Sequence, residues 1–340
     1  MPLSALNVVK PAFEHMVQQL FRPFRWDQWV RLSITGLLAG ELSGAGGCSF
    51  QIPGGARSRD GADQFLAQAV IARNVVLISL AIFVGIALVI ALVYVSSRMR
   101  FVLFDSIVAK ECRIRRYWAA HGEAAYRYFG FQLLFILTVA VTLVSIAGIA
   151  MAIGFGLGWL RNPGRHVVAL IIGGFISLST LATFMITAAV VMVLTRDFVV
   201  PQMALENVGV VEGWSRLWAR LATEKGGYAG YIGLKILLSI GAAVALGIAA
   251  LIVVFVWLIP MGAVAAIAIF GGRAIGLGWN VATISIAIVA GAIGIAIILA
   301  SVLLISAPVV VFFPAYSIYF FAARYAALNA AIYPPPATDG

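Results

Sequence analysis

The sequence predicts an all-α protein, a polytopic membrane bundle of about six transmembrane helices with interfacial amphipathic helices on its cytoplasmic side. Three observations predict this fold class. Of the 340 residues, 63% are hydrophobic and only 11% are charged, whereas a soluble domain has about 25% charged residues. The mean hydropathy is +1.04. Several uncharged stretches exceed the ~20 residues with which a helix crosses a bilayer. This composition excludes a soluble globular protein.

Five long apolar segments can each cross a membrane: residues 75–97, 131–160, 167–194, 231–259 and 283–313. A shorter segment, 30–44, has Arg31 near one end and Glu41 near the other, so its apolar centre is marginal in length. We count it as the first of six spans. If it only lay in the interface, five spans would place the termini on opposite sides of the membrane. Residues 1–330 are expected to form one membrane domain, followed by a disordered cytoplasmic tail at 331–340.

The distribution of positive charge predicts the orientation. With six spans, sixteen Lys and Arg residues lie on the side of both termini and six lie on the other side. Because Lys and Arg concentrate in cytoplasmic loops, both termini are expected in the cytoplasm and the protein in the bacterial inner membrane. The net charge of +10 then reflects orientation, and no nucleic-acid partner is expected. Cys48 and Cys112 fall on opposite sides, which predicts two free thiols.

Two long cytoplasmic connections resemble each other. The segment RFVLFD at 100–105 follows one span, and DFVVPQ at 197–202 follows another span 97 residues later. The segment FFPAY at 312–316 repeats the proline-containing version after the last span. We interpret the chain as three pseudo-repeats, each an interfacial helix leading into a two-span hairpin.

Amphipathic helices are predicted in these cytoplasmic segments. The clearest covers 210–221, where Trp214 and Trp218 belong to an apolar stripe at helical spacing and Glu212 and Arg216 lie on the opposite face. Such helices bind lipid headgroups or a partner, or they only hold the bundle at its depth in the membrane. A second stripe is expected near the amino terminus, between Pro11 and Pro23, from Phe13, Met16, Val17, Leu20 and Phe21.

The candidate residues follow from these patterns. Glu41 is the candidate intramembrane polar residue, with an ordinary position at the outer interface as its alternative. The three histidines His15, His121 and His166 sit in different connections, so no metal site is expected, and no cofactor or catalytic residue either. The candidate interfacial or partner-binding residues are Trp118, Pro201, Glu206, Trp214, Arg216, Trp218 and Arg220.

Residues 197–218, DFVVPQMALENVGVVEGWSRLW, carry a family resemblance. They resemble the membrane-spanning domain of bacterial glycerophosphoryl diester phosphodiesterases and its uncharacterised six-span relatives, which share a Phe-Val-x-Pro motif, an acidic residue, a glycine and then an amphipathic helix. In that family a separate soluble domain does the chemistry. Such a domain needs roughly 200 residues, and no soluble stretch here exceeds about 36. The resemblance therefore implies a membrane module without its enzyme.

These observations lead to one functional expectation and one alternative. The protein is expected to be a non-catalytic membrane scaffold or accessory module, whose partners are membrane lipids and another membrane or cytoplasmic protein. The alternative is a transporter or flippase for an apolar or lipidic substrate, which needs no buried charge in its spans. An intramembrane enzyme ranks third because the spans carry almost no ionisable side chain.

Overall fold

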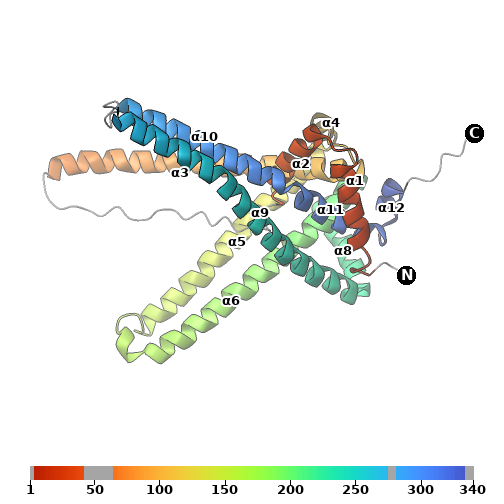
Figure 1. Cartoon of the computed structure of the whole chain (residues 1–340). Coiled ribbons are helices and arrows are strands. Elements are labelled where there is room, and N and C mark those ends of the chain that lie inside the picture. The colour runs from red at the N-terminus through yellow and green to blue at the C-terminus, as the bar shows by residue number, and fades with distance from the viewer. Residues whose placement is uncertain (1–3, 42–63, 275–280, 334–340) are drawn as a thin grey trace, which may run out of the picture. The chain divides into compact units, whose positions relative to one another are not determined.

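The computed structural model describes residues 4–41, 64–274 and 281–333. These residues form helices and contain no β-strand, which confirms the all-α class (Figure 1). The α-helices are α1 (Val9–Phe21), α2 (Trp26–Leu38), α3 (Gln64–Val108), α4 (Ile114–Ala120), α5 (Gly122–Gly156), α6 (Val167–Leu194), α7 (Val200–Glu206), α8 (Val210–Thr223), α9 (Lys225–Ala274), α10 (Val281–Ile305), α11 (Ala307–Ala322) and α12 (Ala326–Ile332). A 3-10 turn covers Pro163–Arg165, and a π-helical turn covers Thr195–Val199.

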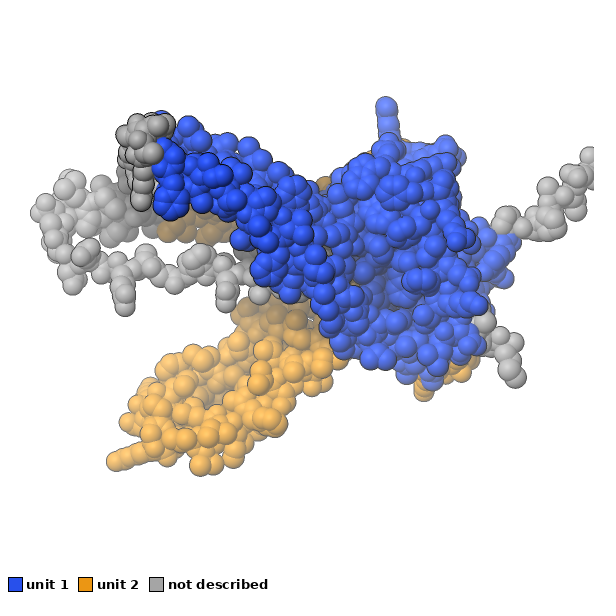
Figure 2. Space-filling view, viewed as in Figure 1, with its two compact units in different colours: residues 1–55, 102–117, 226–340 blue, residues 56–101, 118–225 orange. Residues whose placement is uncertain are grey.

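The chain divides into two compact units (Figure 2). Unit 1 combines residues 1–55, 102–117 and 226–340, so it holds both ends of the chain. Unit 2 combines residues 56–101 and 118–225. Each unit is therefore assembled from segments that are distant in sequence.

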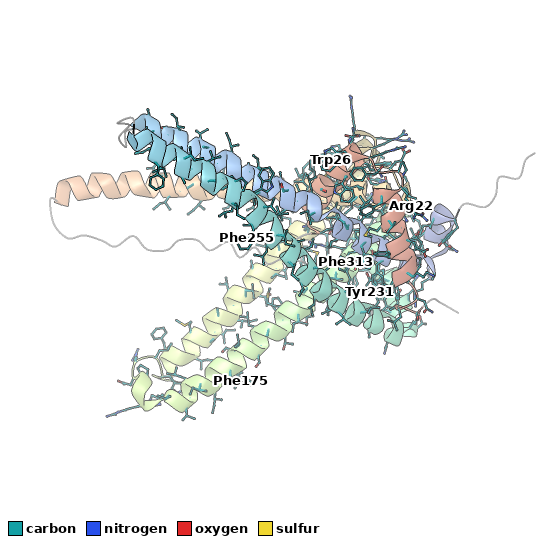
Figure 3. All side chains as sticks on the ribbon, viewed as in Figure 1. Arg22, Trp26, Phe175, Tyr231, Phe255 and Phe313 are labelled. Atoms are coloured by element: carbon teal, nitrogen blue, oxygen red, sulfur yellow. The ribbon has the colours of Figure 1, made fainter. Side chains whose placement is uncertain are left out.

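Five stretches of helix are long and apolar enough to cross a membrane: Leu77–Val108, Gly122–Gly156, Val167–Glu206, Lys225–Gly272 and Ala282–Ala322. At most 6% of the most apolar part of each is buried. Phe175 on α6 and Phe255 on α9, for example, are 69% and 61% exposed (Figure 3). Apolar side chains in such numbers are stable against hydrocarbon and not against water. The five long apolar segments of the sequence are thus confirmed as helices suited to a membrane.

The first predicted span, 30–44, is not among these five. Helix α2 has 13 residues and is about 20 Å long, whereas the hydrocarbon core of a bilayer is about 30 Å thick. Leu32 and Gly36 in its middle are buried against protein. Residues 42–44 of the predicted span lie outside the described residues. The structure thus supports five spans directly, and six spans in three repeats stay a prediction.

The ends of two predicted spans needed correction. Helix α5 stops at Gly156, before the predicted end at 160, because the chain turns at Gly158, whose φ of +73° is a left-handed conformation that favours glycine. Helix α9 continues beyond 259, through Pro260 to Ala274. A proline removes one backbone donor without always ending a helix.

The predicted span 283–313 is two helices. Helix α10 ends at Ile305, and α11 begins at Ala307. Between them the Ser306 hydroxyl donates to the Leu303 carbonyl at 2.6 Å, and Pro308 has no N–H with which to continue the ladder. Helix α11 is the most deeply buried element of unit 1, with Val310, Ala315 and Tyr316 at 0% exposure.

The core of unit 1 surrounds α11. Helices α1, α2 and α12 all pack on it. The first turns of α9 add two aromatic rings: Tyr228 meets Phe320 edge to face at 5.7 Å, and Tyr231 contacts both Phe320 and Tyr316. Beyond these turns α9 runs beside α10, and the Trp257 indole donates to Ser301 at 3.2 Å (Figure 1).

Helix α1 buries a different face from the one the sequence predicts. It begins at Val9, and Met16 and Leu20 are buried as expected, but Phe13 and Phe21 are 55% and 48% exposed. His15 and Gln19 are buried in their place, because the rest of unit 1 supplies polar partners. His15 Nδ1 lies 3.0 Å from the Tyr319 hydroxyl, and Gln19 Nε2 donates to the Ser106 carbonyl at 2.8 Å.

Unit 2 is built on the antiparallel pair α5 and α6 (Figure 1). At one end of the pair, the turn after Gly158 folds back, so that the Leu160 N–H donates to the Gly154 carbonyl at 3.1 Å. At the other end, α6 continues into the π-helical turn and α7, on which α8 packs. Most of the residues predicted to form a functional site lie at this second end.

Candidate functional site

Pro201 lies in the first turn of α7, directly after the π-helical turn. Because proline has no N–H, the ladder cannot continue unchanged through this position. The backbone has widened before it, and the Val200 N–H donates to the Thr195 carbonyl five residues earlier. Phe198 and Val199 in the widened turn are fully buried. Pro201 therefore shapes the backbone on which α8 packs and is itself buried.

Arg216 joins α8 to the end of α7. One guanidinium nitrogen donates to Glu206 and another to Glu212, one turn earlier on α8. The chain can turn between these helices because Asn207 adopts a left-handed conformation with φ of 52°. The hydrogen bonds that Arg216 donates to Glu206 and to Glu212 raise the pKa of Arg216. Glu206 and Arg216 are thus brought together as an inter-helix clamp.

The two tryptophans of α8 have different surroundings. The Trp214 indole N–H donates to the Thr195 hydroxyl at 3.1 Å, which ties α8 to the π-helical turn. Trp218, one turn later, is 65% exposed, and so is Val211 at 84%. The single apolar stripe predicted for 210–221 is therefore split. Val210 and Leu217 are buried, and Trp218 and Val211 present apolar surface.

The remaining predicted residues are placed as follows. Trp118 is half-buried: the Arg98 guanidinium lies over its ring at 5.5 Å and donates to its carbonyl at 3.1 Å. Arg220 is half-buried in the last turn of α8. Glu41 is half-buried just after α2, where its N–H donates to the Gly36 carbonyl at 3.0 Å. Glu41 belongs to unit 1, whereas the α7–α8 residues belong to unit 2.

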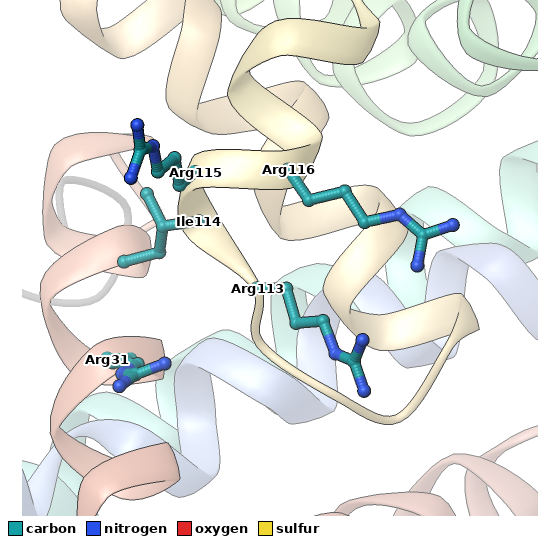
Figure 4. A pocket seen from close by; sticks show the side chains of 5 residues that line it. All are labelled: Arg31, Arg113, Ile114, Arg115 and Arg116. Atoms are coloured by element: carbon teal, nitrogen blue, oxygen red, sulfur yellow. The ribbon is translucent and has the colours of Figure 1, made fainter.

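A second cluster, which we name the arginine pocket, was not singled out from the sequence. It is an open cavity of about 580 Å³ in unit 1, lined by Arg31, Arg113, Ile114, Arg115 and Arg116 (Figure 4). The run RIRR at 113–116 is visible in the sequence. Arg31 is 82 positions earlier in the chain, so only the tertiary structure brings it close to this run.

The arginines of the pocket differ in their partners. Arg31 pairs with Asp27 at 2.9 Å on α2, and Arg113 pairs with Glu111 at 2.8 Å. Within the described residues, Arg115 and Arg116 have no carboxylate at ion-pair distance, and both are exposed. Ile114 and Arg115 extend toward α2, whereas Arg113 and Arg116 extend away from it (Figure 4). The pocket therefore offers two guanidinium groups without a counter-ion.

One thiol lies next to the pocket along the chain. Cys112, beside it, is a buried free thiol whose pKa is raised by burial, so it is a poor nucleophile. Cys48 lies outside the described residues. Among the residues that the structure describes, no group of three or more His, Cys, Asp or Glu side chains could hold a metal ion.

The helical fold and its exposed apolar helices define the class: this is an integral membrane protein with several helices that cross the membrane. Residues 3–331 match a family of unknown function, DUF7544, and the chain belongs to that family. No curated protein and no solved structure matches the chain.

Proposed function

We propose that the protein is a non-catalytic scaffold or accessory module of the bacterial cytoplasmic membrane. The observation that carries this proposal is the contrast between its two kinds of helix. The membrane-crossing helices are at most 6% buried in their most apolar parts, so their faces are available to other membrane helices. By contrast, residues 100–107, residues 194–203 and α11 are mostly buried against protein. A chain built this way holds its shape through its connections and presents its spans to partners.

The repeated segments support a scaffold made of three similar parts. Phe101, Phe198 and Phe313, from the three related connections, are at most 6% exposed. In two parts a short helix precedes a pair of long ones: α4 before α5 and α6, and α8 before α9 and α10. In the first part α1 precedes the 13-residue α2 and the long α3. This order agrees with three pseudo-repeats.

The packing of the two ends supports an even number of crossings. Helix α1 packs on α11, as does α12, and the Tyr316 hydroxyl donates to the Ala5 carbonyl at 3.4 Å. This packing supports placing residues near both termini on the same side of the membrane. Five crossings would separate them, so we assign the sixth crossing to the part of the chain that includes α2. The excess of positive charge on that side favours the cytoplasm.

The likeness of residues 197–218 to phosphodiesterase membrane domains fits this proposal. In this chain the motif serves packing: Pro201 shapes the turn before α7, and Arg216 clamps α7 to α8. We therefore propose that this part of the chain is a structural platform and that any chemistry belongs to a partner.

Photocrosslinking in native membranes tests the scaffold. A benzophenone amino acid replaces Phe175 or Phe255, both of which are exposed on membrane-crossing helices (Figure 3). The scaffold predicts discrete adducts with another protein on illumination. The control is the same variants purified into liposomes, where only lipid and other copies of the chain are available. Adducts with lipid alone in both preparations would overturn the proposal.

Transport is tested in the same liposomes. A fluorescent phospholipid, quenched from outside by dithionite, reports whether the protein moves lipid between leaflets. The scaffold predicts the slow rate of protein-free vesicles. A fast rate that Glu41→Ala abolishes would instead establish the flippase, since Glu41 is the candidate polar group of a span.

A further inference from the structure

We propose that the arginine pocket binds the phosphate group of an anionic membrane lipid. This inference rests on the proposed function only in placing unit 1 at the cytoplasmic surface of a membrane. It adds a binding site, a ligand class and the residues that hold the ligand. Four observations carry it: the charge of the lining, the donor geometry of arginine, the volume of the cavity and the apolar surface beside it.

The positive charge of the lining exceeds the negative charge of the carboxylates that pair with it. Four of the five lining residues are arginines, and none is acidic. Asp27 and Glu111 neutralise Arg31 and Arg113, which leaves the charges of Arg115 and Arg116. Acidic side chains do occur close by: Asp105 and Glu111 line a neighbouring cavity of about 420 Å³. Arg113 and Arg116 line both cavities, whereas Arg31 and Arg115 line only the arginine pocket. The arginine pocket is therefore the side on which an anion is favoured.

Arginine is suited to a phosphate ligand. Its planar guanidinium offers parallel N–H donors that match two oxygens of a phosphate, and it is more weakly hydrated than a lysine ammonium. Every basic residue of the pocket is an arginine. A phosphodiester carries one negative charge, which the guanidinium of Arg115, on the α2 side of the pocket, can balance (Figure 4). Arg116 extends to the other side of the 113–116 segment and adds positive charge near the ligand.

The volume and the surroundings favour a lipid over a free phosphate ion. A cavity of about 580 Å³ lies within the range of about 300–1,000 Å³ typical of sites for whole organic ligands, and it leaves space around a single phosphate. Ile114 gives its wall an apolar part. Near Arg31, Phe24 and Trp26 are 54% and 59% exposed, and exposed aromatic rings of this kind lie at the headgroup level of a membrane.

The test uses the full-length protein in a neutral detergent and a fluorescent phosphatidylglycerol as the probe. The variant is Arg115→Gln with Arg116→Gln, which removes the two guanidinium groups without counter-ions. Because these side chains make no ion pair within the described residues, the variant is expected to fold, and its thermal unfolding is measured alongside. The matched control is Arg161→Gln with Arg165→Gln, which removes two exposed arginines from the α5–α6 turn.

Loss of two positive charges near the lipid phosphate, of roughly 1 kcal/mol each, is expected to weaken phosphatidylglycerol binding by about 10- to 30-fold. The control variant should bind within about twofold of the wild type. An equal loss in both variants would show a general effect of charge and overturn the site. A second variant, Arg115→Lys with Arg116→Lys, keeps the charge and loses the paired donors, so it should bind more weakly than the wild type and more tightly than the glutamine variant.

Competition distinguishes the sources of the phosphate. Unlabelled phosphatidylglycerol should displace the probe, and phosphatidylcholine should displace it poorly because its choline neutralises the phosphate. Displacement by inorganic phosphate as effective as by phosphatidylglycerol would contradict a lipid ligand. Displacement by polyglutamate as effective as by the lipid would point to an acidic peptide and would also overturn the proposal. Each outcome is independent of the crosslinking test of the scaffold.

Discussion

The rings of Tyr231 and Tyr316 stack with their centroids 5.1 Å apart and their planes within 6° of parallel. Tyr231 lies in the second turn of α9, and Tyr316 lies in the middle of α11. Both are fully buried. The stack therefore fixes where the longest helix of unit 1 meets the buried helix at its centre, and it offers the first test of this core.

Replacing Tyr231 with alanine should destabilise the protein by about 3–5 kcal/mol, because a buried ring leaves a cavity and its stacking is lost. Tyr231→Phe keeps the stack and should stay within about 1.5 kcal/mol of the wild type. Thermal unfolding in detergent measures both. The matched control is Tyr126→Ala, since Tyr126 is 66% exposed. If Tyr231→Ala melted like this control, α9 would not dock on α11.

A side chain at position 36 should destabilise the protein, because Val310 lies opposite Gly36. A Cβ on Gly36 would lie 2.0 Å from a methyl group of Val310, so Gly36→Ala should destabilise the protein by about 1–3 kcal/mol. Adding Val310→Ala makes room for the new methyl group and should restore part of this loss, which a double-mutant cycle would detect as coupling.

Gly85 provides the control for Gly36. It also lies in a helix, but a Cβ there would meet nothing within 4 Å. Gly85→Ala should therefore be neutral or stabilise the helix by up to about 1 kcal/mol. Equal unfolding temperatures for the Gly36 and Gly85 variants would show that α2 does not approach α11 this closely.

His15 should make the stability of the fold depend on pH. Burial, together with the positive charge of Lys110, lowers its pKa from 6.5 to about 4. Between these values the unfolded chain binds a proton that the folded chain does not. The stability that neutral His15 provides is present above pH 6.5 and is lost as the pH falls toward 4, by about 3 kcal/mol in all.

Thermal unfolding of the wild type and of His15→Gln at a series of pH values isolates this contribution. Carboxylates titrate in both proteins, so only the difference between the two is diagnostic. The wild type should lose stability relative to His15→Gln as the pH falls from 6.5 to 4. The difference in stability between the two proteins should stay constant above pH 7. His166→Gln, in the α5–α6 turn, is the matched control. Parallel curves for wild type and His15→Gln would mean that His15 is not buried in the neutral form.

Trp214 and Trp218 should respond differently to the same substitution. Trp214→Phe removes the hydrogen bond to Thr195 and should lower stability by about 1 kcal/mol. Trp218→Phe keeps an exposed aromatic ring and should change stability by less than about 0.5 kcal/mol. Thr195→Val should cost more in the wild type than in the Trp214→Phe variant. It removes the bond to the Val191 carbonyl at 2.7 Å in both, but the bond to Trp214 only in the wild type. Equal effects of the two tryptophan substitutions on stability would contradict the different surroundings of Trp214 and Trp218. They would support the single apolar stripe predicted from the sequence.

Much of the fold follows from local features of the chain. The long uncharged stretches predicted helices at 75–97, 131–160 and 167–194 because apolar residues without charge are stable only in lipid or in a core. Helical spacing predicted α8, and the turn between α5 and α6 follows from its Gly and Pro residues. The spacing of four between Glu212 and Arg216 also predicted their ion pair, since neighbours on one face of a helix meet whatever surrounds them.

Other features depend on contacts between distant segments. Residues 307–322 are as apolar as the membrane-crossing helices, and hydropathy cannot distinguish a helix that faces lipid from one that is enclosed by α1, α2 and α12. The same limit hid the burial of His15, which Tyr319 makes possible from 304 positions away.

The sequence by itself determined that this is a helical membrane protein and which segments are apolar enough to cross, because hydropathy and helical periodicity are local properties. Only the tertiary structure decided that α11 is the centre of a packed core and that Arg31 joins the arginines at 113–116. Packing and charge clustering depend on which segments become neighbours in space, and composition and spacing along the chain do not record this.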